Sequence, residues 1–330
     1  MSWILLLGLA LIAAPVASLA PGVPNPASAA APGPVAGPVG ADANAGSWSV
    51  DPVVISVSHV GPPLWRISSG TDEVWVLGVI GGVRSQDWDS RRLERVLATS
   101  SDVVTQPVGR VDMLGMAAMQ FGGKLDSPRG AVLPDLLGPG VWARTAPVWS
   151  AAGLSPEAYR RRRPGIAAIL GQFDHDEANH LQDPEDRIRR LAAQRHVPVR
   201  PVAVYPANVV VRATAALPQD KAVACYLAET EALEFQTAHH AALEAAWRTS
   251  DVTGLRAHEL RRDVWDCLSD ADPVIGSFMT RTVDDSVQRI RDALAQHRHA
   301  LFVLGVGSLV LSNGVLGRLA AAGYRVDSPD

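Results

Sequence analysis

Leu301-Phe302-Val303-Leu304-Gly305-Val306-Gly307-Ser308, near the end of the chain, is the stretch that decides the fold. Its apolar run reaches one glycine, passes a second and continues into a helical pattern over residues 309–319. This order is typical of a buried strand whose carboxyl end opens into a turn, where α/β proteins usually bind ligands. The earlier octet Val74-Trp75-Val76-Leu77-Gly78-Val79-Ile80-Gly81 has the same construction. The two octets therefore predict two halves of one site.

The first octet belongs to a region in which strands and a helix are expected. Residues 64–77 contain two apolar segments around the polar segment 68–73, a pattern that predicts a hairpin. Asp89 or Ser90 can then cap a helix with one apolar face. A second buried strand is expected at residues 102–105, because an apolar run there stops before a proline.

The later chain continues the alternation of strands and helices. Asp183-Pro184-Glu185 begins a helix with a capping acid and a proline at the first position. Residues 197–204 contain two prolines and predict a strand near a sheet edge. The other expected elements are helices over 219–247 and 252–268, a long helix through Val287, Ile290 and Leu294, a terminal helix over 313–322 and a strand over 324–326.

This alternation predicts a mixed α/β (α+β) fold. Two strand-containing halves form a central, partly parallel sheet, and a large helical insertion separates them. Within the insertion, Met113, Met116 and Met119 have the three-residue spacing of a short helix whose methionines fill a core. The run Arg160–Arg163 predicts a solvated helix end, because no glycine-rich loop accompanies it to form an anion site.

The N-terminal sequence indicates export. Residues 1–29 are expected to be a signal peptide, since Trp3–Ala14 is an apolar run shorter than a membrane span and Ala27-Ser28-Ala29 supplies a cleavage pattern. No Lys or Arg precedes Arg66, and an uncleaved anchor is the alternative. Residues 30–49 are rich in Ala, Pro and Gly and are expected to be a disordered linker before a single domain over 50–330. The expected location is periplasmic or secreted, with no membrane span after signal removal.

Charge and cysteine content narrow the function classes only slightly. The formal net charge of −4 gives no overall attraction to nucleic acid or to acidic membranes. The two cysteines, Cys225 and Cys267, are compatible with a disulfide in an exported protein and equally with two buried thiols.

The order of the two octets and of the strands and helices expected around them resembles that of the TraB/GumN family, whose fold is shared by the metal-dependent Tiki proteases. The resemblance covers most of residues 60–330. Its most specific parts are the two octets and the terminal Gly-Tyr strand. The full set of matching segments comprises the octets, Pro63-Leu64-Trp65-Arg66, Trp88, Asn313-Gly314-Val315-Leu316 and Gly323-Tyr324-Arg325-Val326.

The resemblance implies a metal site that this sequence does not retain. In that family each octet ends as Gly-x-x-His and a glutamate follows the strand after the first helix, a set that can hold a divalent metal such as Mn, Co or Zn. The two histidine positions here are Gly81 and Ser308, and the glutamate position is Gln106. None of these replacements is an equivalent ligand. The family's glycines are present here as Gly78 and Gly305. An acidic residue that the resemblance implies in the middle strand is replaced by Ala203 or Val204, and an implied Arg-Asn pair is replaced by Arg281-Thr282.

One other cluster of potential ligands is present. Glu177 and His180 are three residues apart and Asp176 and His180 are four apart, so a helix would place them on one face. An exposed polar turn before the helix at Asp183 is the simpler interpretation.

The first hypothesis is therefore a degenerate, exported family member, a pseudoenzyme that acts as a binding or interaction protein in the cell envelope without catalytic residues or cofactor. Its partner, an envelope protein or a small ligand, is not identified by the sequence, and nucleic acid is not expected. The alternative is a metal-dependent hydrolase or protease with a relocated site, for which Asp176, Glu177 and His180 are candidates.

Overall fold

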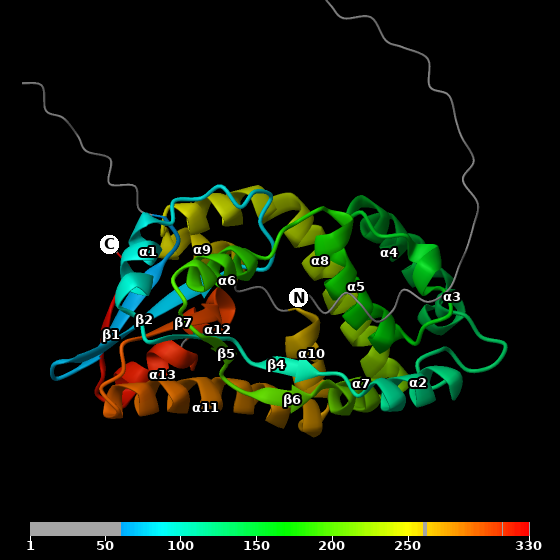
Figure 1. The fold of residues 1–330 in the computed structure, drawn as a ribbon. Helices are drawn as coiled ribbons and strands as arrows, with labels where there is room; N and C mark the ends of the chain where they lie inside the picture. Colours follow the sequence, from blue (N-terminus) through cyan, green and yellow to red (C-terminus); the bar gives the residue numbers. More distant parts are fainter. Residues whose placement is uncertain (1–60, 260–262, 312, 330) are drawn as a thin grey trace, which may run out of the picture. The chain divides into compact units, whose positions relative to one another are not determined.

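The computed structural model describes residues 61–259, 263–311 and 313–329. The expected signal peptide, the expected linker and the start of the expected domain lie outside these residues. The described chain has the mixed α/β fold that the sequence predicts, with a six-stranded sheet and many helices (Figure 1).

The central sheet has the strand order β5-β3-β7-β2-β1-β8. β1 and β2 form the expected antiparallel hairpin, and β8 pairs with β1, also antiparallel. The four strands β2, β7, β3 and β5 are parallel to one another, so the sheet is partly parallel as predicted. The strands are Leu64–Ser69 (β1), Asp72–Val79 (β2), Asp102–Thr105 (β3), Val199–Pro201 (β5), Ala300–Gly305 (β7) and Arg325–Asp327 (β8).

The two octets are adjacent in the sheet. β2 pairs with β7 in a register that sets Gly78 opposite Leu304 and Val79 opposite Gly305. The two glycines that match in sequence are thus offset by one residue across the pair. β7 lies between β2 and β3 and every residue from Ala300 to Leu304 is buried, which explains why its sequence is uninterrupted and apolar.

Helices pack against this sheet and also form a separate helical part. α1 (Arg91–Thr99) buries Leu93, Val96 and Leu97 against the sheet, and its N-cap is Ser90. Further helices that contribute to the sheet core include α6 (Pro184–Gln194), α9 (Val252–Glu259), α11 (Pro273–Ala295), α12 (Val306–Val310) and α13 (Val315–Ala321).

The helical part occupies most of the chain between β4 and α11. Its elements are α2 (Met113–Phe121), α3 (Leu133–Leu137), α4 (Pro139–Ala151), the 3-10 helix η2 (Pro156–Tyr159), α5 (Pro164–Ala178), α7 (Ala207–Ala215) and α10 (Val264–Ala271). A small parallel sheet of β4 (Val108–Arg110) and β6 (Val204–Pro206) lies beside it. The large helical insertion predicted from the sequence is therefore present.

One long helix connects the two parts. α8 (Gln219–Arg248) has 30 residues and is about 45 Å long at 1.5 Å per residue. Its first half buries Cys225, Tyr226 and Leu233 in the helical part, and its second half buries Trp247 in the core of the sheet. Cys225 also forms a disulfide with Cys267 of α10. Of the two alternatives that the sequence left open, a disulfide or two buried thiols, the structure contains the disulfide.

Two expected elements differ in their boundaries. The single helix expected over 252–268 consists of α9 and α10, because Asp263 caps α10 by accepting hydrogen bonds from the backbone of Trp265 and Asp266. The strand expected over 197–204 is divided into β5 at the edge of the large sheet and β6 in the small one. Among the described residues, no helix combines the length and the apolar composition that crossing a bilayer requires.

Candidate functional site

Three neighbouring parallel strands end at the same edge of the central sheet. In the order β3-β7-β2, Gln106 follows β3, Ser308 lies in α12 directly after β7, and Gly81 follows β2. Ligand sites in α/β proteins form outside this edge, because the carboxyl ends of parallel strands and the loops after them meet there. The sheet topology thus makes this edge the candidate site.

Contacts join these positions in two groups. A Cβ atom on Gly305 would lie 3.7 Å from Gln106 Oε1, and the Ser308 hydroxyl donates a hydrogen bond to the Gly305 carbonyl at 2.8 Å. A Cβ atom on Gly81 would lie 3.7 Å from Asp176 Oδ2. Gln106 and Ser308 therefore both adjoin Gly305, whereas the nearest group to Gly81 is a carboxylate from α5.

The glycines at this edge have different roles. A Cβ atom on Gly78 would lie 2.7 Å from Trp65 and 3.0 Å from Val306, so glycine is required for the packing of the strand. Gly81 meets nothing closer than the Asp176 carboxylate, and its φ is outside the positive range. A larger side chain at position 81 would consequently fit without backbone strain.

Glu185 is a buried acid beside the candidate site that the sequence analysis assigned only to a helix start. Its side chain is in the first turn of α6, Oε2 pairs with Arg189 at 3.0 Å, and Oε1 has no hydrogen-bond partner among the described residues. The pKa of Glu185 is raised to about 7, mainly by burial and to a smaller extent by the nearby Asp183 carboxylate. Interactions with Arg189 and Gln106 lower this pKa but only partly offset the rise. Glu185 thus exchanges a proton near neutral pH.

Glu185→Gln is expected to change the pH dependence of stability. Because the folded-state pKa is raised above 4.5, the folded protein binds more protons than the unfolded chain, and its stability falls as pH rises from about 4.5 to about 7. The variant should lack this fall, which is on the order of 3 kcal/mol at about 1.4 kcal/mol per pKa unit. Urea unfolding at pH 5 and pH 8 measures the difference. The exposed Glu234→Gln in α8 is the control, and a fall of equal size in all three proteins would contradict the assignment.

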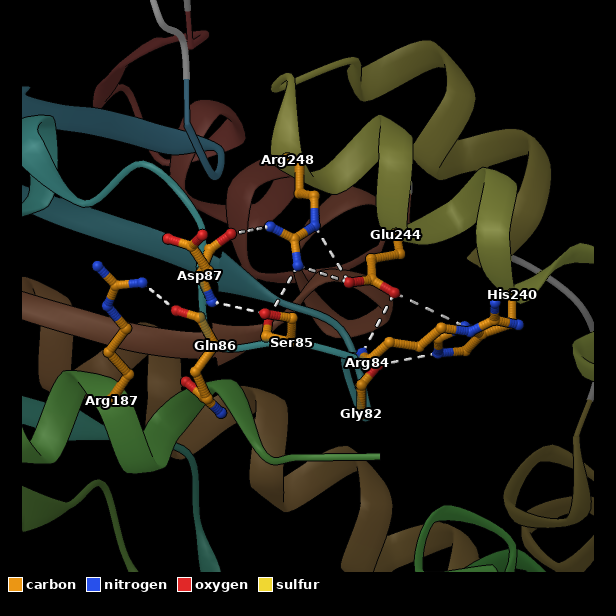
Figure 2. Close-up of polar contacts among 9 residues, drawn as sticks. All are labelled: Gly82, Arg84, Ser85, Gln86, Asp87, Arg187, His240, Glu244 and Arg248. Atoms are coloured by element: carbon orange, nitrogen blue, oxygen red, sulfur yellow. Dashed lines mark hydrogen bonds and ion pairs between the residues drawn. The ribbon is translucent and has the colours of Figure 1, made fainter. Parts of the chain in front are cut away.

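The loop after β2 is held by the second half of α8 (Figure 2). His240 Nε2 is 3.0 Å from the Gly82 carbonyl, and Glu244 Oε2 accepts a hydrogen bond from the Arg84 backbone at 3.2 Å. Arg248 donates to the carbonyls of Ser85 at 2.8 Å and Asp87 at 2.5 Å and also pairs with Glu244 at 2.7 Å. Three successive turns of one helix therefore fix the backbone that follows Gly81.

α6 holds the opposite side of the same loop. The Arg187 guanidinium donates to the Gln86 carbonyl (Figure 2). It also lies 4.5 Å from the Trp88 ring and donates to Ser90 Oγ at 2.9 Å. Val83 and Gln182 exchange backbone hydrogen bonds of 2.9 and 2.8 Å. The loop is thus bound on two sides, so the position of Gly81 is set by contacts with α6 and α8.

The alternative candidates Asp176, Glu177 and His180 do not lie on one helix. α5 ends at Ala178, and His180 lies beyond it with a φ of 54°, so the three side chains do not share one helical face. Asp176 faces Gly81, and His175 Nδ1 is 3.5 Å from Asp176 Oδ1. Among the described residues, no group of three or more His, Cys, Asp or Glu side chains could hold a metal ion.

The remaining positions implied by the resemblance lie in α11 and at or next to β6. Arg281 and Thr282 lie within α11, and the Thr282 hydroxyl donates to the Met279 carbonyl one turn earlier at 2.7 Å. The Ala203 carbonyl accepts from the Val108 backbone at 3.0 Å, and Val204 is an exposed residue of β6. Neither of these two hydrogen bonds involves Gly81, Gln106 or Ser308.

Comparison with known proteins gives one match. A model of the TraB/PrgY/gumN family matches residues 63–328. This range contains both octets, the candidate site and the whole helical insertion. No curated protein and no solved structure matches the chain.

Proposed function

The chain belongs to the TraB/PrgY/gumN family, and we propose that it is a member that has lost metal-dependent catalysis and acts as a binding protein in the cell envelope. The carrying observation is the set of residues after three adjacent strands. Gly81, Gln106 and Ser308 stand where the resemblance implies two histidines and a glutamate. Neither a glycine nor a neutral amide can replace an anionic or imidazole ligand.

The contacts at the sheet edge support this proposal. The Ser308 hydroxyl is already used by the Gly305 carbonyl, so it is turned toward its own chain. The loop that carries Gly81 is fixed by Arg187, Glu244 and Arg248, and a loop bound on both sides offers a preformed surface to a ligand. Preformed surfaces lower the entropy lost on binding. Binding without turnover is the function that these features favour.

A location outside the cytoplasm is part of the same proposal. It rests on the signal-peptide pattern of residues 1–29 and the following Ala/Pro/Gly-rich segment. The disulfide between Cys225 and Cys267 supports it, because disulfides persist in oxidising compartments such as the periplasm.

A second candidate function is a metal-dependent hydrolase with relocated ligands. Two acids adjoin the altered positions: Asp176 lies next to Gly81, and Glu185 interacts with Gln106. Carboxylates are ligands of divalent ions, so these side chains favour this candidate over other enzymes.

Metal content distinguishes the two functions. The protein purified without chelator is expected to contain no stoichiometric Mn, Co or Zn by elemental analysis, because the altered positions supply no strong ligand set. Addition of each metal should leave the unfolding temperature unchanged. One tightly held ion per chain would refute the loss of the metal site. In that case Asp176→Asn and Glu185→Gln would show whether the relocated acids hold the ion.

A further inference from the structure

The outward face of α2 is apolar and exposed. Leu114 is 84% exposed and Phe121 is 90% exposed, and the exposed Ala118 lies between them at helical spacing. Met113 at the start of the helix is 47% exposed. α2 has no charged residue, although a surface helix normally turns polar side chains outward.

The opposite face of α2 already anchors the helix to the protein. Met119 is buried with Leu125 and Ile166, and the half-buried Met116 packs against the same cluster. The methionine helix expected from the sequence is thus confirmed, but only its inner face fills a core. The outer side chains contribute little to folding, so their apolar character calls for another cause.

Exposed cations precede and follow α2 in the chain. Arg110 precedes α2 and Lys124 follows it; both are exposed and have no ion pair within the described residues. Arg129 and Arg161 are likewise exposed and unpaired there. The Ser127 backbone donates to the Arg161 carbonyl at 2.7 Å, which places part of the arginine run beside the segment that follows α2.

The neighbouring acids Asp112 and Asp126 form no ion pair with these cations. Asp126 pairs with Arg162 at 2.8 Å, and Asp112 accepts a hydrogen bond from the Leu114 backbone as the cap of α2. Arg162 also donates to Gln120 Oε1 at 2.8 Å, which fixes the end of α2 against the arginine run. The run Arg160–Arg163, interpreted from the sequence as a solvated helix end, is in fact partly engaged with α2.

We propose that this face, defined as Leu114 and Phe121 of α2 with Arg110, Lys124, Arg129 and Arg161, docks onto an anionic lipid surface. Leu114 and Phe121 enter the boundary between headgroups and acyl chains, and the cations contact the anionic headgroups. The protein binds from one side and does not cross the bilayer. Figure 1 shows α2 beside α7 in the helical part of the chain, away from the strands β1 and β2.

A second copy of the chain fits this face less well. A symmetric dimer through α2 would bring the cations of one copy against the same cations of the other. An anionic lipid surface instead offers acyl chains to the apolar side chains and negative headgroups to the cations.

The test is sedimentation of the full chain with vesicles of phosphatidylcholine alone or mixed with phosphatidylglycerol. The wild-type protein is expected to bind the mixed vesicles, and binding should weaken as salt concentration rises. Leu114→Ser with Phe121→Ser should lower the partition coefficient about tenfold or more. Lys124→Gln with Arg129→Gln should lower it about fivefold per charge removed.

The matched control is Val274→Ser in α11, a residue that is 50% exposed on another helix. It should bind like wild type, and all variants should keep the wild-type unfolding temperature because the changed side chains are exposed. If the Leu114/Phe121 variant binds the mixed vesicles as well as wild type does, the proposal is overturned. That result would also be obtained if the N-terminal apolar segment alone inserted into the vesicles. Equal binding to neutral vesicles would also overturn it. So would concentration-dependent dimers that this variant abolishes in the absence of vesicle binding.

Discussion

Trp247→Ala is expected to lower the free energy of unfolding by about 3–5 kcal/mol, the range for removing a large aromatic side chain from a core. Trp247 is fully buried at the junction between α8 and the central sheet. Its ring packs edge-on against Trp88 with centroids 5.4 Å apart, and its Nε1 donates to the Gly78 carbonyl at 2.8 Å. Alanine would leave a cavity and remove the partner of that carbonyl. Urea unfolding monitored by far-UV circular dichroism measures the loss.

Trp247→Phe separates packing from the hydrogen bond. Phenylalanine keeps most of the ring but cannot donate to the Gly78 carbonyl, so a loss of about 1–3 kcal/mol is expected. Amide hydrogen exchange should also rise in residues 82–90, because the same part of α8 carries His240, Glu244 and Arg248, which hold that loop. A loss below about 1 kcal/mol for Trp247→Ala would contradict the packing of α8 on the sheet.

The parts of the fold that could be predicted are those determined by local patterns. β2 and β7 are buried parallel strands, and an apolar run ending at glycine indicates such a strand without knowledge of its neighbours. The helix beginning at Pro184 was marked by the Asp183 cap, whose side chain accepts a hydrogen bond from the Glu185 backbone. The resemblance of the motifs to a family was also enough to expect the fold, and the match to the family model confirms this resemblance.

The contacts that hold the candidate site could not be predicted from one sequence. Glu244 and Arg84 are separated by 160 residues, and no local pattern indicates that this carboxylate meets that backbone amide. Glu185 has the position of an ordinary acid in a first helical turn, and only the packing of α6 against the strand ends buries it. The division of the helix expected over 252–268 is different, because Asp263 before Val264 is a capping signal within the sequence itself.

The triple variant Gly81→His, Gln106→Glu and Ser308→His is expected to bind a divalent metal. Two imidazoles and a carboxylate would then follow three adjacent parallel strands, the donor set that the family resemblance implies. Position 81 accepts histidine without backbone strain, and Asp176 lies next to it. A carboxylate at position 106 would stand beside Glu185, and a bound cation would relieve the repulsion between the two acids.

Metal binding should appear as stabilisation that grows with metal concentration. A ligand that binds only the folded state adds about 2.7 kcal/mol at 100 times its dissociation constant, so the unfolding temperature should rise with added Mn, Co or Zn. The single variant Gln106→Glu is the control, since it introduces the carboxylate without the imidazoles and should gain little.

Little or no hydrolysis is expected from the triple variant. Ala203, Val204 and Thr282 still differ from the family pattern, and changes around a metal site can lower affinity or activity by about 10- to 100-fold. A folded triple variant that gives no heat of binding in calorimetric titration would mean that the strand ends no longer hold these three positions around one point. The loss of metal chemistry would then involve the backbone of the site as well as its side chains.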